Sequence, residues 1–407
     1  MYNFTIGLSM LISLLLIIVN ALVSYVIGII GKNTYEKTGA IEIAINKLNV
    51  LNQYIYNIFS ISSVFLTGMI MLPHMRVFLK PLGSWGKAIF FLSLVILIFV
   101  NSILNQLILH PTKQMIRGTN ETKKELLYNH LRFLVFFYFP IIIIPLIKMI
   151  LPSELKSRLF SDKILNIISS MSIIFIVLLV TPLFVGIVLK AVPMNSNELN
   201  QKLANILKKA NIQNCKIYIW STKNRKIANA LVTGYIQKRI YVSDYLLENF
   251  TEDEVQSIIA HEIGHIKKNH LMIRLGFILL GNVLFRIVGL LLDYYNHIIP
   301  FWVGICIISA LFILYFYILF LAISRSQERQ ADSFVLQIGI DPEVFISALY
   351  KLTKLNHSLF RFNRFQEILR THPSTEQRIE WVRKKAKISN RKIELVQERG
   401  EHDIPLI

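Results

Sequence analysis

TEDEVQSIIAHEIGHIKKNHLMIRLGFILLGNVLFRIVGLLL, residues 251–292, carries the two signals that decide the fold. Its second half, 271–292, is a run of about 20 mostly apolar residues, the length that a helix needs to cross a bilayer core. Its first half opens another helix, because Thr251 followed by Glu254 three residues later is a capping box. The stretch therefore predicts a polar helix that lies directly beside the membrane.

Apolar runs of membrane length recur along the chain. Apolar residues make up 54% of the 407 positions and charged residues only 17%. They gather in long runs, each sufficient for one helical crossing. The sequence therefore predicts a mainly α-helical, polytopic membrane protein with about seven transmembrane helices, at roughly 5–30, 54–74, 87–109, 131–151, 165–190, 271–292 and 299–323.

The formal charge of +19 fits a membrane protein better than a nucleic-acid-binding one. Lys and Arg are retained on the cytoplasmic side of polytopic proteins, where they also attract anionic lipids. We therefore expect membrane lipids as partners and no nucleic acid. Basic residues are absent before Thr5 and from 293–300, whereas eleven lie between Ala191 and His270. This asymmetry predicts a cell-membrane protein with its N-terminus outside and its C-terminus in the cytoplasm.

Two polar blocks lie outside the spans, and an even number of spans separates them. Both blocks are therefore expected on the cytoplasmic face, where they can build one α+β domain. In the first block, apolar spacing predicts a helix over Glu198–Ala210 and alternation predicts strands at Lys216–Trp220 and Arg239–Val242. The predicted organisation is five transmembrane helices in 1–192, the first part of a catalytic domain in 193–270, helices six and seven in 271–323, and the second part of the catalytic domain in 324–407.

The string HEIGH at 261–265 is the chemical motif of the chain. On a helix, His261 and His265 lie about 40° apart, so both imidazoles project from one face and can reach one Zn²⁺. Glu262 lies beside them and can take a proton from the metal-bound water. The alternative is an accidental match on an amphipathic helix. The helix context derived above favours a catalytic metal site.

A catalytic zinc needs a third protein ligand and one open position. His270 lacks the spacing of the longer H-E-x-x-H-x-x-G-x-x-H motif, and Asp293 and His297 fall on the other side of the membrane. Glu328 remains, just past the seventh span and one helical turn before Asp332. We expect Glu328 to bind the metal and Asp332 to support the second ring nitrogen of a ligand histidine. The alternative for Glu328 is a solvated charge at a helix start.

These motifs together resemble a known family. The order of HEIGH, two further spans, E-x-x-x-D at 328–332 and THPSTEQRI at 371–379 is similar to that of the type I CAAX prenyl proteases and the related bacterial heat-shock membrane zinc proteases. The resemblance is carried mainly by residues 229–379, and the seven spans match the former group. It implies one Zn²⁺ per chain and transmembrane helices that enclose a chamber. The Ile-, Lys- and Asn-rich composition is typical of a bacterial member.

The resemblance also implies roles for residues outside the metal site. Asn229 and Ala230, in NALVTG, match an Asn-Ala pair beside an edge strand that holds an extended peptide through main-chain hydrogen bonds. His372, in THP, matches a histidine that stabilises the tetrahedral oxyanion. The alternative for His372 is a buried histidine that is hydrogen-bonded to backbone.

Two arginines allow more than one interpretation. By the same resemblance, Arg378 binds a substrate carboxylate or an acidic partner; alternatively it is a surface residue paired with Glu376 or Glu380. Arg286 lies in the middle of the sixth span, where an unpaired cation facing lipid is costly. Either a wet chamber solvates it or its side chain extends to the interface.

The residues therefore predict an integral membrane zinc metalloendopeptidase that hydrolyses peptide bonds with a water activated by Glu262. Its substrate is a peptide or protein, either a precursor to be matured or a damaged membrane protein in quality control. A hypothesis of another class is a non-catalytic membrane scaffold with a structural zinc, for which Glu262 would have no purpose.

Overall fold

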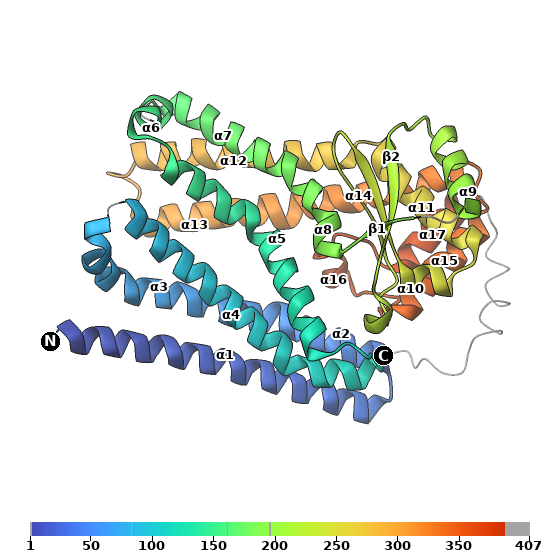
Figure 1. The fold of residues 1–407 in the computed structure, drawn as a ribbon, viewed down its shortest axis with the longest axis horizontal. Coiled ribbons are helices and arrows are strands. Elements are labelled where there is room, and N and C mark those ends of the chain that lie inside the picture. The colour runs from blue at the N-terminus through green and yellow to red at the C-terminus, as the bar shows by residue number, and fades with distance from the viewer. Residues whose placement is uncertain (1, 83, 161, 195–196, 387–407) are drawn as a thin grey trace.

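The computed structural model describes residues 2–82, 84–160, 162–194 and 197–386. Long helices run roughly along one axis, and a small sheet with shorter helices lies at one end of them (Figure 1). The two polar blocks of the sequence meet at that end, where helices from both blocks pack together. One α+β domain is therefore assembled from segments on either side of the sixth and seventh spans.

Seven segments of the described chain are helical, long and apolar enough to cross a membrane, which confirms the predicted number. The second span contains a π-helical segment at Asn52–Tyr56. The seventh runs over Phe301–Gln337, beyond the predicted end at 323, because the helix continues unbroken into its polar residues. The helices of the spans are α1 (Tyr2–Thr38), α2 (Ile41–Leu51) with α3 (Asn57–Leu79), α4 (Ser84–Arg117), α5 (Lys123–Ile150), α7 (Lys163–Val180) with α8 (Val185–Leu189), α12 (His270–Tyr294), and α13 (Phe301–Phe312) with α14 (Phe320–Gln337).

Polar side chains inside the spans bridge neighbouring helices. The guanidinium of Arg286, in α12, donates to Asn166 Oδ1 at 3.2 Å and to Ser170 Oγ at 2.9 Å, both on α7. Polar groups of this kind hold membrane helices together where water is scarce. The guanidinium of Arg286 is thus hydrogen-bonded to a neighbouring helix. These contacts do not require a wet chamber around it, and the enclosed chamber stays a prediction. The short helix α6 (Ser153–Phe160) joins α5 to α7.

The sheet has the strand order β1-β2-β4-β3. β2 and β4 are parallel, and the two outer pairs are antiparallel. The two strands predicted from alternation are β2 and β4. β3 lies at an edge, so its outer main-chain groups have no strand partner within the sheet. The strands are β1 (Val192–Pro193), β2 (Cys215–Trp220), β3 (Ala230–Thr233) and β4 (Lys238–Ser243).

Helix α11 (Glu252–Lys267) is the centre of the domain. Its predicted capping box is present: Thr251 Oγ1 accepts from the Glu254 N–H, and the Glu254 carboxylate accepts from the Thr251 N–H. Ile259 and Ile263 are fully buried, and burial of each such side chain stabilises the fold by about 1.5–3 kcal/mol. The surrounding helices are α9 (Asn197–Lys209), α10 (Asp244–Asn249), α15 (Pro342–Leu355), α16 (Arg364–Ile368) and α17 (Thr375–Lys385).

Candidate metal centre and active site

A glycine sets the distance between the two helices that carry the motifs. A Cβ placed on Gly264 of α11 would lie 3.0 Å from Ala331 Cα and 3.1 Å from Phe334 Cβ, both on α14. These separations are tighter than ordinary carbon contacts, so only glycine fits without a shift. The close approach of α11 and α14 brings HEIGH opposite the E-x-x-x-D turn.

Three side chains converge where the helices meet. His261 Nε2 lies 3.2 Å from His265 Nε2 and 3.4 Å from Glu328 Oε2, and His265 Nε2 lies 3.4 Å from Glu328 Oε1. A tetrahedral zinc with bonds of about 2.0–2.2 Å separates its ligand atoms by about 3.3–3.6 Å. The group therefore has the donor set and the size to hold one metal ion.

The chemistry of these donors also fits a cation. All three residues are buried. Burial and the charge of His261 lower the pKa of His265 to about 2, so its imidazole is neutral and available for a metal. Burial alone would lower the pKa of His261, but hydrogen bonds to the Asp332 and Glu328 carboxylates raise it to about 9. The negative surroundings that hold a proton on His261 would equally hold a divalent ion.

Asp332 lies behind His261 rather than in the group of three. Its Oδ1 is 2.9 Å from His261 Nδ1, which fixes the ring with Nε2 toward the metal position. Arg378 Nε donates to Asp332 Oδ2 at 3.0 Å and an Arg378 Nη to Oδ1 at 2.6 Å. Arg378 therefore pairs with Asp332 instead of Glu376 or Glu380, and Asp332 raises the pKa of its guanidinium despite burial.

His270 lies behind His265 as Asp332 lies behind His261. The sequence did not predict this role for His270. Its Nδ1 is 2.8 Å from His265 Nδ1, and its Nε2 is 3.2 Å from Gln330 Oε1. If Nε2–H donates to Gln330, His270 Nδ1 accepts from His265 Nδ1–H and leaves His265 Nε2 free for a metal. The sequence feature that could have indicated this role is the spacing of five residues between His265 and His270, but His270 was considered only as a direct metal ligand.

A cleft of about 960 Å³ is lined by two of the three side chains, His261 and Glu328. Glu262 lines it beside His261, and burial raises the pKa of Glu262 to about 7. Asn229 and Ala230, at the start of edge strand β3, line the same cleft. At its other end the walls are aromatic and aliphatic, formed by Phe137, Phe312, Phe316, Tyr317, Phe320 and Leu321. The cleft thus joins a polar centre to an apolar region at the membrane spans.

His372 reaches the centre from a loop. Its Nδ1 is 3.0 Å from Glu328 Oε2, and its side chain is 64% exposed, so it is not the buried histidine of the alternative interpretation. Arg325, on α14, donates to the carbonyls of Ile368 and Arg370 at 2.7 and 3.0 Å. These two bonds fix the loop just before His372.

Comparison with known proteins finds relatives of the domain that carries this site. Residues 193–386 match the family described as Peptidase family M48. A protein named Protease HtpX homolog from Pyrococcus abyssi is 29% identical over 218 residues, which cover 46% of this chain and 73% of that protein. CAAX prenyl protease 1 of Saccharomyces cerevisiae is 31% identical over 86 residues, 20% of this chain and 19% of that protein.

A solved structure extends the similarity to the membrane spans. The crystal structure of S. mikatae Ste24p superimposes with a TM-score of 0.58 and 16% sequence identity, covering 92% of this chain and 98% of that one. The shared fold confirms the predicted fold class. Residues 193–386 thus resemble peptidase family M48, and the chain is a membrane metalloprotease similar to the HtpX proteases and the CAAX prenyl proteases.

Proposed function

We propose that the protein is a zinc-dependent endopeptidase whose metal is held by His261, His265 and Glu328. The observation that carries the proposal is the set of separations of 3.2–3.4 Å between their ligand atoms, which suits a tetrahedral ion. A bound zinc would supply Lewis-acid chemistry, polarising the scissile carbonyl and making a water more acidic. Asp332 and His270 would orient the two imidazoles.

The remaining steps belong to side chains of the cleft. Glu262 accepts a proton from the attacking water and passes it to the leaving amine, a role suited to a carboxylate with a pKa raised by burial. His372 is exposed to the cleft and donates a hydrogen bond to the oxyanion that forms on the carbonyl. Arg378 acts through Asp332, and a direct contact with the substrate carboxylate remains its second possible role.

The substrate is an extended polypeptide segment. β3 has a free edge within the sheet and begins at the cleft, so a peptide can add as a further strand along Asn229 and Ala230. The aromatic end of the cleft suits apolar side chains of a membrane-associated substrate. Maturation of a small precursor and quality control of damaged membrane proteins both fit this site. We also propose that the domain lies in the cytoplasm and the N-terminus outside, because the basic residues of the domain favour the cytoplasmic side.

The test compares purified wild type with Glu262→Ala and Glu328→Ala for zinc content and for cleavage of a mixed peptide library, read by mass spectrometry. We expect about one zinc per chain in wild type and Glu262→Ala, less in Glu328→Ala, and cleavage by wild type alone. Full zinc in Glu328→Ala would contradict the third ligand. Zinc without cleavage, and an unchanged cellular phenotype in Glu262→Ala, would favour the scaffold hypothesis.

A further inference from the structure

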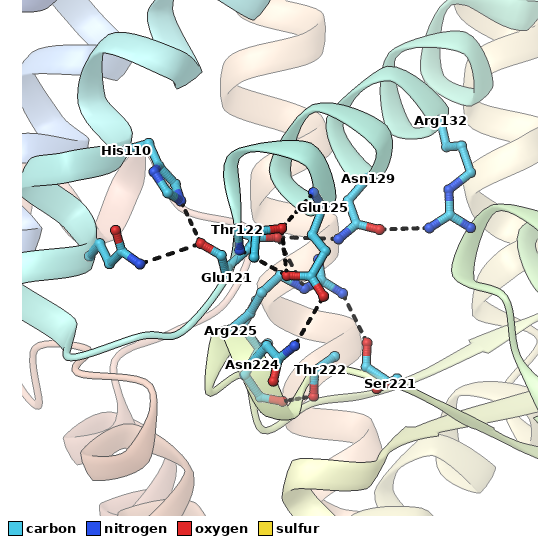
Figure 2. Close-up of polar contacts among 12 residues, drawn as sticks. His110, Glu121, Thr122, Glu125, Asn129, Arg132, Ser221, Thr222, Asn224 and Arg225 are labelled. Atoms are coloured by element: carbon cyan, nitrogen blue, oxygen red, sulfur yellow. Dashed lines mark hydrogen bonds and ion pairs between the residues drawn. The ribbon is translucent and has the colours of Figure 1, made fainter.

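The connection between α4 and α5, residues 118–122, lies against a loop of the protease domain at 223–226 (Figure 2). Two main-chain carbonyls of that loop accept hydrogen bonds from residues of the transmembrane part. The Asn120 N–H donates to the Asn224 carbonyl at 3.0 Å, and an Arg117 Nη donates to the Lys226 carbonyl at 3.1 Å. The transmembrane part therefore holds the loop by its backbone.

Two carboxylates extend the contact, one in the connection and one in the first turn of α5. Glu125 Oε1 accepts from the Asn224 side-chain amide at 3.1 Å, and Glu121 Oε1 lies 3.9 Å from Arg225 Nε (Figure 2). Asn129, in α5, donates to the same Glu121 oxygen at 3.2 Å, so a hydrogen bond from the transmembrane part also fixes the carboxylate. The side chains of Glu121 and Arg225 are 12% and 25% exposed. Water and salt therefore screen this pair less than they would a pair on the open surface.

The loop held in this way leads directly to the strand that lines the cleft. Ala228 is bracketed by the Asn356 side chain, which accepts from its N–H at 3.0 Å and donates to its carbonyl at 2.7 Å. Asn229 is paired with Ser243 through both of its main-chain groups, at 3.0 and 2.9 Å. Because 224–226 is fixed to the membrane helices and 228–229 to the protease domain, the start of β3 has little freedom relative to either part.

We propose that the α4–α5 connection and the helix ends that flank it are a positioning device for the substrate-binding strand: Glu121 in the connection, Glu125 in α5 and Arg117 in α4 set where β3 lies relative to the membrane spans, and thereby how well a peptide binds. The inference rests on the proposed role of β3. Glu121, Glu125 and Arg117 touch neither the metal ligands nor Glu262, so they act on substrate binding and not on the chemical step. A purely architectural contact would instead change overall stability, without a selective effect on KM.

The experiment uses the full-length protein with Asn224→Ala and Glu121→Ala. Asn224→Ala removes the side-chain hydrogen bond to Glu125, while the hydrogen bonds to the main-chain carbonyls of residues 224 and 226 remain. Glu121→Ala removes the carboxylate that faces Arg225 and accepts from Asn129. Glu121→Gln keeps an acceptor oxygen and serves as the conservative rescue. The matched control is Lys223→Ala, on the same loop, which breaks the exposed pair with Glu248 and no contact to the membrane part.

Each variant is measured for KM and kcat on one library-derived peptide, for zinc content, and for hydrogen exchange of residues 226–233. Loss of one or two such bonds should raise KM by about five-fold or more, with kcat within about two-fold. The amides of 226–233 should exchange faster, zinc should stay at the wild-type level, and Glu121→Gln and Lys223→Ala should resemble wild type.

Unchanged KM together with unchanged exchange in both alanine variants would overturn the proposal, as would a fall in kcat alone. If Glu121→Ala fails to fold, Asn224→Ala decides by the same two readouts. If wild type cleaves no peptide, the proposed function fails on its own terms, and faster exchange at 226–233 in Asn224→Ala still tests the positioning of β3.

Discussion

The metal side and the substrate side of the cleft are built differently. His261, His265 and Glu328 are buried on two helices whose approach is set by Gly264. His372, whose Nδ1 reaches Glu328, is 64% exposed on a loop, and β3 is the edge of a small sheet. Groups that must hold one geometry sit on packed helices, whereas groups that meet a variable substrate sit on a loop and a free edge.

The largest expected effect separates chemistry from metal binding on the buried side. In Glu262→Gln the side chain keeps its size but cannot accept a proton, so kcat should fall by about 10²–10⁴-fold. Zinc content should stay at the wild-type level. Lys267→Gln, an exposed change on the same helix, is the control and should keep full activity. A Glu262→Gln protein with near wild-type kcat would remove Glu262 from the chemistry.

His270→Ala tests whether the metal side depends on support behind the ligands. Without the contact at His265 Nδ1, the imidazole loses its fixed tautomer and orientation. Zinc affinity, measured by competition with a chelator, should fall by about 10–100-fold. Lys268→Ala, an exposed neighbour, provides the control. Equal affinity in His270→Ala and wild type would show that His265 needs no such partner.

The pH dependence of cleavage tests the environment of Glu262. Burial raises its pKa to about 7 in the metal-free protein, and a bound cation lowers it from there. The active form is the carboxylate, so kcat should fall as the pH drops through this range, by about ten-fold for each unit below the pKa. We expect the acid limb between the ordinary glutamate range and about 7. Activity that is flat down to pH 4 would contradict the assignment.

Gly264→Ala tests the packing that joins the two motif helices. The added methyl would meet Ala331 at 3.0 Å, so α11 and α14 must separate, at a cost of about 1–3 kcal/mol in the free energy of unfolding. A lower Tm and weaker zinc binding should appear together. Gly276→Ala, where a Cβ meets no atom within 4 Å, is the matched control. Normal zinc affinity in Gly264→Ala would show that the helix spacing does not limit the site.

Arg325→Ala is expected to have the smallest effect, and it acts on the substrate side. It removes the two hydrogen bonds that fix the loop before His372. Each is worth about 1 kcal/mol to the position of the loop; if half of that loss is felt at the transition state, kcat should fall by about five-fold while zinc content is unchanged. Arg329→Ala, one turn further along α14, is the control. Loss of zinc in Arg325→Ala would mean that the loop supports the metal side as well.

Much of this architecture could be predicted from sequence because its signals are local. Membrane-length apolar runs predicted the seven spans, and Thr251 with Glu254 predicted the start of α11. The spacing of HEIGH and the turn from Glu328 to Asp332 predicted which side chains meet, and the structure brings them together. Each of these signals lies within one continuous segment of the chain, either a single apolar run or one or two helical turns.

The rest depends on contacts between distant segments, which spacing cannot reveal. His270 was weighed as a ligand because its distance from HEIGH was visible, whereas its contact with Gln330 was not. Arg378 was expected to contact an acidic partner or a substrate carboxylate, or to pair with Glu376 or Glu380; which acidic residue it meets could not be predicted, because its bond to Asp332 crosses 46 positions. The contact of Glu121 with Arg225 joins two blocks that carry no shared motif.

X-ray absorption at the zinc edge of the purified wild type tests the central claim most directly. We expect one zinc per chain with two imidazole nitrogens at about 2.0–2.1 Å and carboxylate oxygen from Glu328 completing the protein ligands. In Glu328→Gln the zinc should be weakly held and easily removed by a chelator. A site with three imidazoles, or with sulfur, would contradict the ligand set proposed from His261, His265 and Glu328.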